Sequence, residues 1–336
     1  MRIIAWSDLH AHPWQEAERP GRWGDYIRVI REVRAIAAKR KADALVFCGD
    51  LFESSRTLRA DVASAVYAEL LHGNDDSSTP EFYLSGNHDR LQNGHNALEP
   101  LRYALSGGRV ILPSDTVNSP PIVTHGICGV VLGFLPNGAV MSNNKQWAKH
   151  IPPHDILFTH TDIADAYMGG GLRTKSDGVP FRLLMASRAK VLICGHYHHP
   201  QSFQRGGCKC YFVGSPIQNN WSDLETGKSN PRGVLEIDIT PQTDALCAVR
   251  RIPLTGFPRF LRAGDASAMP EDFILHQDTN MIEEEDEPED SIVAAVATGS
   301  LDASTLRAYA EFKSQPVSSV DALVKYGLQF VHSARS

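Results

Sequence analysis

Acidic, amide and imidazole side chains recur in short clusters, and each cluster directly follows an apolar run. Gly86-Asn87-His88-Asp89 follows Phe82-Tyr83-Leu84. One such cluster means little, because Asn and Asp favour turns for backbone reasons alone. The repetition is what indicates chemistry, because four further apolar runs end in residues of the same types. Those residues are Asp8 and His10, Gly49 and Asp50, His160, and Gly195, His196 and His198.

Together these side chains have the chemistry of an open metal site. Ligands of open α/β sheets bind at the carboxyl ends of the strands, so these clusters could converge on one place. Imidazoles, carboxylates and an amide without thiolates disfavour a closed structural zinc site and suit Mn²⁺, Fe or Zn with bound water. So many ligands fit two ions about 3.5–4 Å apart that share a carboxylate. The candidate ligands are Asp8, His10, Asp50, Asn87, His160, His196 and His198.

The spacing at the first strand gives a further candidate. Asp8 and His10 are two positions apart, so an extended backbone would direct their side chains to the same side. His12 continues this spacing and could touch substrate or the edge of the site, but its support as a ligand is weaker.

The elements that must position these clusters follow a βαβαβ pattern. Apolar stripes over residues 24–41 and 60–72 predict helices between strands at 2–7, 44–47 and 82–84. This alternation predicts a parallel sheet with right-handed crossovers.

A different pattern begins downstream of the third strand. Short apolar runs at 110–112, 122–124 and 130–134 are separated by Pro, Gly and Asn rather than by helices. They predict a second, more antiparallel sheet, which residues 211–213 and 234–237 close. The fold class we predict is α/β, a two-sheet β-sandwich flanked by helices with a small C-terminal appended unit.

The candidate ligands end before residue 240, which suggests a division of the chain. We assign residues 1–240 to the metal-dependent domain, 241–282 to a small capping unit, 283–291 to an acidic linker and 292–336 to C-terminal helices. An apolar stripe over 318–331 could dock on the main domain or on a partner.

The charge of the chain is unevenly distributed. The net charge of −6 disfavours nucleic acid at first, but residues 283–290 hold seven of the 39 acids, and the remainder balances 33 bases against 32 acids. Between His160 and Lys209 seven bases accompany three acids, which suits either a basic patch near the metal site or an ordinary solvated surface. The bases are Arg173, Lys175, Arg182, Arg188, Lys190, Arg205 and Lys209.

The six cysteines show no disulfide framework. Cys208-Lys209-Cys210 could bind a metal, but a strand with two thiols on the same side explains it better. The sequence opens on a strand, without a signal peptide or an apolar run long enough to cross a membrane. We therefore expect a cytoplasmic protein in a reducing compartment, with no membrane partner.

Read in order, the clusters resemble the motifs of the calcineurin-like metallophosphoesterases over roughly residues 1–240. Finer cues are similar to the SbcD-type DNA repair exonuclease subunits of bacteria and phages. One departure is Glu53, where that family often has Asp or His. The cues are Gly49-Asp50-Leu51-Phe52, Gly86-Asn87-His88-Asp89, Tyr211-Phe212-Val213-Gly214-Ser215-Pro216 and Gly233-Val234-Leu235-Glu236-Ile237-Asp238.

The resemblance implies two divalent ions, typically Mn²⁺, although Mg²⁺, Fe or Zn would also suit. It implies that Asp50 bridges the two ions. The remaining ligands would be Asp8, His10 and His198 for one ion, and Asn87, His160 and His196 for the other.

The resemblance also implies catalytic roles for His88 and Asp89. His88 would lie near the scissile phosphate and donate a proton to the leaving oxygen or stabilise its charge. Asp89 would orient the imidazole of His88.

The function implied is a metal-dependent DNA exo/endonuclease that hydrolyses phosphodiester bonds, works as a homodimer and binds an SbcC-like coiled-coil ATPase through the helices after residue 290. The alternative is a phosphatase or a small-molecule or cyclic-nucleotide phosphodiesterase, because the motifs detect only a phosphate ester. A non-catalytic scaffold is disfavoured, because every expected ligand and His88 are present.

Overall fold

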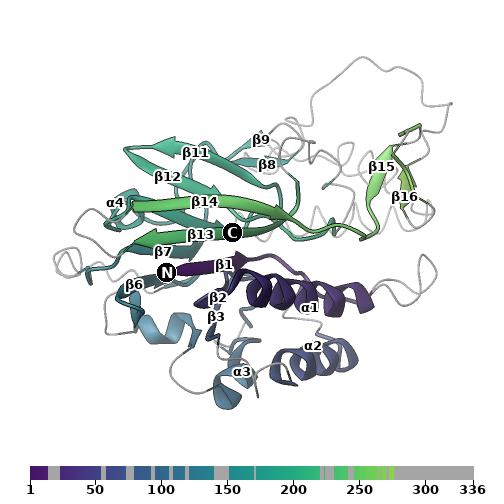
Figure 1. Ribbon diagram of the computed structural model, residues 1–336, viewed down its shortest axis with the longest axis horizontal. Coiled ribbons are helices and arrows are strands. Elements are labelled where there is room, and N and C mark those ends of the chain that lie inside the picture. The colour runs from purple at the N-terminus through teal and green to yellow at the C-terminus, as the bar shows by residue number, and fades with distance from the viewer. Residues whose placement is uncertain are drawn as a thin grey trace, which may run out of the picture. The chain divides into compact units, whose positions relative to one another are not determined.

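The computed structural model describes most of the chain up to residue 275 (Figure 1). Met1–Leu275 form one compact unit. The acidic linker predicted at 283–291 and the helices predicted within 292–336 lie outside the described residues. The described residues are 1–13, 23–53, 58–72, 79–91, 95–105, 109–117, 121–139, 151–169, 172–219, 223, 231–240, 246–262, 264–265, 267–269 and 272–275.

Helices and strands alternate at the start of the chain, and strands dominate later. The helices predicted at 24–41 and 60–72 are present as α1 and α2. In chain order the elements are β1 (Arg2–Trp6), α1 (Trp23–Arg40), β2 (Ala44–Phe47), α2 (Ala60–His72), β3 (Glu81–Leu84), α3 (Glu99–Ala104), β4 (Val110–Ile111), the 3₁₀ helix η1 (Pro113–Thr116), β5 (Val123–Ile127), β6 (Val130–Leu135), β7 (Ile156–His160), β8 (Tyr167–Gly169), β9 (Leu172–Arg173), α4 (Phe181–Leu184), β10 (Val191–Gly195), β11 (Gln201–Arg205), β12 (Cys208–Phe212), β13 (Gly233–Thr240), β14 (Leu246–Pro253), β15 (Phe260–Arg262) and β16 (Phe273–Leu275).

The first sheet has the strand order β14-β13-β1-β2-β3-β4. Strands β1 to β4 are parallel, as the βαβαβ pattern predicts. The prediction that residues 234–237 close the second sheet is wrong, because β13 pairs antiparallel with β1. Arg2 on β1 explains part of this pairing, because its Nε lies 2.9 Å from the buried Glu236 carboxylate and 2.7 Å from Asp238.

Strand β14 falls within residues 241–282, for which the sequence predicts a small capping unit. It pairs along its whole length with β13 and so extends the first sheet. Strands β15 and β16 form a separate parallel pair in the same part of the chain.

The second sheet has the order β11-β12-β10-β7-β6-β5. Its three inner pairs are parallel and its two outer pairs are antiparallel. The expectation of a more antiparallel sheet is therefore correct only for the two outer strand pairs.

Strand β4 pairs parallel with β3 in the first sheet, so the assignment of residues 110–112 to the second sheet is wrong. The reason is α3, which supplies the crossover between β3 and β4. This six-residue helix is too short to show a clear apolar period.

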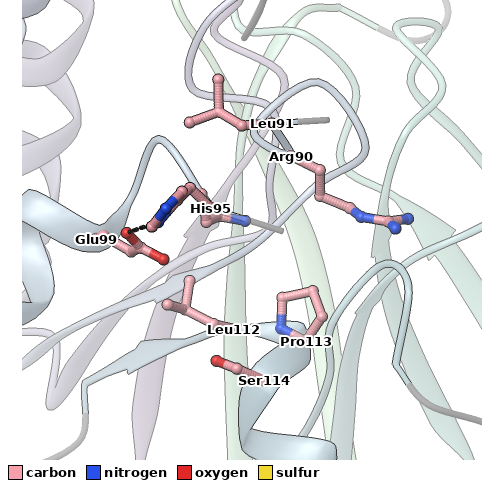
Figure 2. A pocket seen from close by; sticks show the side chains of 8 residues that line it. Arg90, Leu91, His95, Glu99, Leu112, Pro113 and Ser114 are labelled. Carbon is pink, nitrogen blue, oxygen red and sulfur yellow. Dashed lines mark hydrogen bonds and ion pairs between the residues drawn. The ribbon is translucent and has the colours of Figure 1, made fainter. Parts of the chain in front are cut away.

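A pocket of about 230 Å³ lies beside α3 (Figure 2). Arg90 and the pair formed by His95 and Glu99 are among its lining side chains, with 3.2 Å between His95 Nδ1 and Glu99 Oε2. The pocket includes none of the predicted metal ligands.

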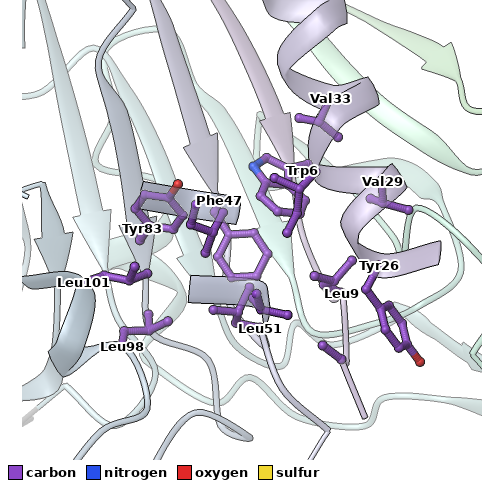
Figure 3. Packing of buried hydrophobic residues seen from close by; sticks show 14 of the residues in the cluster. Trp6, Leu9, Tyr26, Val29, Val33, Phe47, Leu51, Tyr83, Leu98 and Leu101 are labelled. Atoms are coloured by element: carbon purple, nitrogen blue, oxygen red, sulfur yellow. The ribbon is translucent and has the colours of Figure 1, made fainter. Parts of the chain in front are cut away.

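Both faces of the first sheet are buried. On one face, Trp6, Phe47 and Tyr83 pack against Tyr26 and Val33 of α1 (Figure 3). The opposite face packs against the second sheet and forms a continuous apolar layer with it. Burial on both faces explains why the strands read as unbroken apolar runs. The layer includes Ile3, Val46 and Leu84 from the first sheet and Leu132, Phe158 and Ile193 from the second.

Among the described residues, no helix is both long enough and apolar enough to cross a membrane.

Candidate metal centre

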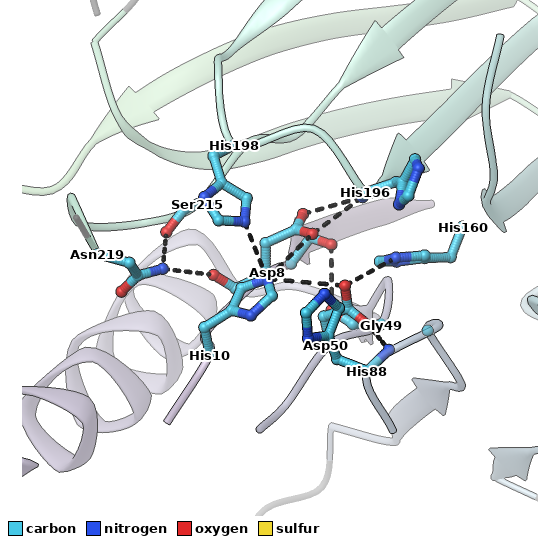
Figure 4. Close-up of polar contacts among 12 residues, drawn as sticks. Asp8, His10, Gly49, Asp50, His88, His160, His196, His198, Ser215 and Asn219 are labelled. Carbon is cyan, nitrogen blue, oxygen red and sulfur yellow. Dashed lines mark hydrogen bonds and ion pairs between the residues drawn. The ribbon is translucent and has the colours of Figure 1, made fainter. Parts of the chain in front are cut away.

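The predicted ligands from both sheets meet at the carboxyl ends of their strands (Figure 4). Asp8 and His10 follow β1, Asp50 follows β2 and His88 follows β3, all in the first sheet. His160 ends β7, and His196 and His198 follow β10, all in the second sheet. The centre therefore lies where the two sheets face each other.

One group of ligands gathers around His10. Its Nε2 atom lies 2.9 Å from Nε2 of His198 and 3.9 Å from the Asp8 carboxylate. Ligand atoms of Asp8, His10 and His198 all lie within 4.8 Å of one another, which is close enough for one ion.

A second group gathers around His160. Its Nε2 atom lies 3.0 Å from the Asn87 side-chain oxygen, and His196 Nδ1 lies 2.9 Å from the same oxygen. His160, His196 and Asp50 again offer atoms within 4.8 Å of one another.

Asp50 stands between the two groups. Its Oδ2 atom lies 3.0 Å from His160 Nε2 and 3.6 Å from His10 Nε2. Its Oδ1 atom accepts a hydrogen bond from the His88 backbone N–H at 2.8 Å, which fixes the plane of the carboxylate. One carboxylate oxygen therefore faces both groups, as a bridging ligand must.

The backbone at the centre is unusual. Asp8, His10, Asp50 and His196 adopt φ values of 54°, 51°, 61° and 93°, which side chains other than glycine rarely adopt. Such conformations persist at functional sites when the surrounding structure holds them. The extended backbone invoked to align Asp8 with His10 is therefore wrong, and tight left-handed turns direct the two side chains instead.

Gly49 makes room for this arrangement. Its φ is 102°, and a Cβ atom there would lie 2.4 Å from His160 Nδ1. A side chain at this position would displace the imidazole that meets Asp50.

Charges within the centre stabilise one another. Burial opposes the ionisation of Asp50, but the neighbouring imidazoles of His160 and His10 outweigh it and hold the pKa of this carboxyl below its usual range. Burial would lower the pKa of His160, yet the Asp50 carboxylate raises it to about 9. A metal cation would compete with the His160 proton for the same atoms.

The far ring nitrogens of three histidines face carboxylates that the sequence analysis did not assign to the site. Glu53 Oε2 lies 2.7 Å from His10 Nδ1, Asp162 Oδ1 lies 3.0 Å from His196 Nε2, and Asp223 Oδ1 lies 3.3 Å from His198 Nδ1. Metal-binding histidines commonly have such partners, which fix the tautomer and the ring orientation. Sequence spacing offers a weak signal only for Asp162, which lies two positions after His160.

These partners test whether the residues fit a metal. The Nε2 atoms of His10 and His198 lie 2.9 Å apart, and each ring has a carboxylate near its Nδ1 atom. A ring that carries its proton on Nδ1 offers the Nε2 lone pair to a cation. The donor set therefore fits divalent metal ions, which would neutralise phosphate oxygens and lower the pKa of a bound water.

His88 lies at the edge of the centre and is half-buried. Its ring meets the ring of His10 edge-on, with 4.8 Å between the centroids. Its Nδ1 atom faces the backbone carbonyl of Glu53 and donates to it, which leaves Nε2 to meet a substrate.

Asp89 does not occupy the position predicted for it. Its two oxygens accept hydrogen bonds from the backbone N–H groups of Asp50, Leu51 and Gly86, each at 2.9 Å. The contact to His88 Nδ1 comes from Glu53 instead. Asp89 thus ties the loops after β2 and β3 together and does not orient the His88 imidazole. Burial and the nearby Asp50 charge raise the pKa of Asp89 to about 6.

Two weaker sequence candidates belong to neither group of ligand atoms. His12 Nδ1 lies 2.7 Å from the carbonyl oxygen of His10 and 2.9 Å from the Tyr26 hydroxyl. Cys208 and Cys210 are buried on β12 and pack in the core on the outer face of the second sheet.

Three of the seven basic residues between His160 and Lys209 lie at the end of β10 opposite the centre. Arg188 and Lys190 precede β10, and Lys209 pairs in register with its first residue, Val191. The centre lies at the other end of β10, beyond Gly195. These three residues therefore form no basic patch beside the metal ligands, whereas Arg173 ends β9 and Lys175 follows it.

Two known proteins are similar to this chain in sequence. The DNA double-strand break repair protein Mre11 of Haloferax volcanii is 24% identical over 255 residues, which cover 74% of this chain and 52% of that protein. This chain thus spans about half the length of that relative. The UDP-2,3-diacylglucosamine hydrolase of Enterobacter sp. (strain 638) is 25% identical over 227 residues, or 61% of this chain and 85% of the hydrolase.

Solved structures of phosphoesterases are also similar. The purple acid phosphatase PPD1 from seeds of yellow lupin (Lupinus luteus) has a TM-score of 0.43 and 14% identity, covering 74% of this chain and 51% of the phosphatase. The E. coli phosphoesterase YfcE has a TM-score of 0.34 and 17% identity, covering 75% and 100% of the two chains. The family described as calcineurin-like phosphoesterase matches residues 1–200. With more than half of its length matched, the chain belongs to the calcineurin-like phosphoesterases, a family of metal-dependent hydrolases.

Proposed function

We propose that the chain is a DNA exo/endonuclease of the SbcD type, which hydrolyses phosphodiester bonds at a centre of two divalent ions. The similarity to Mre11 over 74% of the chain carries this proposal. The sequence cues that distinguish SbcD-type subunits point the same way.

The exposure of the centre suits a polymeric substrate. Asp8, His10 and Asp50 are buried, whereas the His196 and His198 side chains are 20% and 21% exposed. Asn87 and His88 are half-buried beside them. A phosphate on a long strand could therefore reach the ligands without entering an enclosed cavity.

The chain's own residues would contribute in three ways. Asp50, with one oxygen fixed by the His88 N–H, holds the two ligand groups in register. His88 keeps Nε2 available for the reacting phosphate, because Nδ1 is engaged by the Glu53 carbonyl. From there His88 can donate a proton to the leaving oxygen or stabilise its charge, a contribution typically worth about 10²–10⁴-fold in rate.

A phosphatase or small-molecule phosphodiesterase remains the second candidate. The similarity to a UDP-2,3-diacylglucosamine hydrolase, which covers 85% of that enzyme, favours it. The placement of the basic residues at the far end of β10 is also compatible with a small substrate.

The discriminating experiment offers both kinds of substrate to the purified chain. Linear duplex DNA and bis-p-nitrophenyl phosphate would be incubated with Mn²⁺, Mg²⁺ or chelator, beside the Asp50→Ala variant. Mn²⁺-dependent degradation of DNA that disappears in the variant supports the nuclease. Hydrolysis of the small ester with DNA left intact supports the second candidate, unless an SbcC-like partner restores cleavage.

The partners follow from the same proposal. We propose a homodimer that binds an SbcC-like coiled-coil ATPase through residues 292–336. Light scattering after size-exclusion chromatography measures the dimer, and removal of residues 292–336 should abolish capture of the ATPase.

If basic side chains contact DNA phosphates, the affinity of the chain for DNA should fall steeply as the salt concentration rises.

A further inference from the structure

Asp223 is a fully buried carboxylate beneath His198. Its Oδ1 atom lies 3.3 Å from His198 Nδ1 and 3.1 Å from Arg232 Nη2. Its Oδ2 atom accepts the backbone N–H of Asn219 at 2.7 Å. The carboxylate is thereby held from three directions, and one of them is a predicted metal ligand.

Arg232 completes the arrangement. It is buried and donates from Nη1 to the backbone carbonyls of His198, Ser215 and Ile217 at 2.9, 3.2 and 3.3 Å. Its planar guanidinium can make these contacts and still reach Asp223, which a lysine could not do. Arg232 immediately precedes β13 of the first sheet, whereas His198 follows β10 of the second.

A neighbouring side chain carries the connection to the other sheet. Asn219 donates from its amide to the Ser215 hydroxyl at 2.9 Å and reaches the Asp8 carbonyl at 3.5 Å (Figure 4). Asp8 and His198 belong to the same group of ligands. The polar network thus spans both sheets beneath one ion position.

We propose that Asp223 and Arg232 are positioning residues for the metal centre. Asp223 lies 3.3 Å from His198 Nδ1 and so favours the tautomer that keeps the proton on Nδ1 and presents Nε2 toward the ion. Arg232 holds the Asp223 carboxylate in place and sets the backbone of the His198 loop. The inference concerns the metal centre alone and does not depend on whether DNA is the substrate.

Asp223 and Arg232 could also serve only the stability of the fold, because removal of one partner from a buried ion pair strongly destabilises a protein. The chain offers a matched control for this effect. Asp155 is also a buried aspartate, and it lies 3.0 Å from Arg188 and accepts the Val131 N–H at 2.7 Å. It precedes β7 at the end opposite His160, roughly 16 Å from the centre at about 3.3 Å per residue.

The test compares the metal affinity of Asp223→Asn with that of Asp155→Asn. An asparagine at position 223 has one oxygen and one NH₂ group in place of two carboxylate oxygens. In either orientation the NH₂ group therefore faces a donor, which is the Asn219 N–H on one side or His198 and Arg232 on the other. Mn²⁺ affinity is measured by isothermal titration, and unfolding is measured in chelator to give the stability of the metal-free chain. We expect Asp223→Asn to bind Mn²⁺ about 10–100-fold more weakly, as loss of an outer partner typically does. Asp155→Asn should bind as the wild type does.

A second readout reports the tautomer directly. In the Zn²⁺-loaded protein with ¹⁵N-labelled histidine, His198 should show a protonated Nδ1 in the wild type and in Asp155→Asn. This signature should be lost or weakened in Asp223→Asn. If Asp223→Asn does not fold, Arg232→Lys takes its place, since it keeps the charge but loses the planar fork.

Two results would overturn the proposal. One is an Mn²⁺ affinity of Asp223→Asn within about twofold of the wild type. The other is a loss of affinity in both variants that follows their loss of stability in chelator, which would show a merely structural role. Because the readouts are metal affinity and a tautomer, they remain interpretable if the chain cleaves no DNA.

Discussion

The Nε2 atoms of His10 and His198 lie 2.9 Å apart, although 188 residues separate the two histidines in the chain. Each ring turns its other nitrogen toward a carboxylate, Glu53 for His10 and Asp223 for His198. With a proton on each Nδ1 atom, both Nε2 lone pairs would be available to one divalent cation.

Replacement of Asp50 should abolish the centre, because its Oδ2 atom faces both ligand groups. Loss of a residue that only contacts a metal ligand typically costs about 10–100-fold in activity. Because Asp50 is itself a predicted ligand, we expect Asp50→Ala to reduce phosphodiester hydrolysis by more than about 100-fold. Metal content measured by mass spectrometry should fall from two ions per chain. A variant that retained two ions and full turnover would show that Asp50 is not the bridge.

Replacement of His88 should separate turnover from metal binding. His88→Ala should lower kcat by about 10²–10⁴-fold and leave Mn²⁺ affinity unchanged, because the proton donor is lost but the ligands remain. His95→Ala is the matched control, since that imidazole is 63% exposed and lies away from the ligands. A wild-type rate for His88→Ala would remove His88 from the reaction.

Glu53→Gln should weaken metal binding without abolishing it. The carboxylate lies 2.7 Å from His10 Nδ1, but its side chain is 43% exposed, so water can replace part of the contact. We expect a loss of Mn²⁺ affinity near tenfold, the lower end of the range for such partners. Glu99→Gln, which breaks the exposed pair with His95, should have no effect, and equal affinities for both variants would contradict the role of Glu53.

Asp89→Asn should act on stability. The carboxylate accepts three backbone N–H groups, and an amide can accept at only one of its two positions. Leaving a buried donor unpaired costs about 1–3 kcal/mol, which denaturant unfolding in chelator would measure. If Asp89→Asn lowered kcat but left stability and metal affinity unchanged, Asp89 would act by orienting the His88 imidazole, as the sequence predicts.

Metal removal should lower the thermal stability of the wild-type chain. An ion that binds only the folded state adds about 2.7 kcal/mol at 100 times its Kd, or a rise in Tm of about 5–10 °C for a domain of this size. Differential scanning fluorimetry with Mn²⁺ and with chelator measures this difference. It should vanish in Asp50→Ala, and an equal rise in that variant would indicate binding elsewhere.

Local patterns in the sequence were sufficient to predict much of the chemistry. Apolar runs followed by Asp8, Asp50, Asn87 or His160 indicate strand ends with ligands, because a strand and the turn after it are encoded by neighbouring residues. The helices α1 and α2 were predictable for the same reason, since each shows several turns of an apolar stripe.

Only the tertiary structure decided which distant segments meet. Strand β13 joins β1 across more than 200 positions, and nothing in its own apolar run specifies that partner. Glu53, Asp162 and Asp223 become partners of metal-ligand histidines through folding alone. Folding also decides that the Glu53 carbonyl, and not Asp89, contacts the His88 imidazole. Such a hydrogen bond depends on where two loops lie in space, and the spacing of residues along one loop does not determine this.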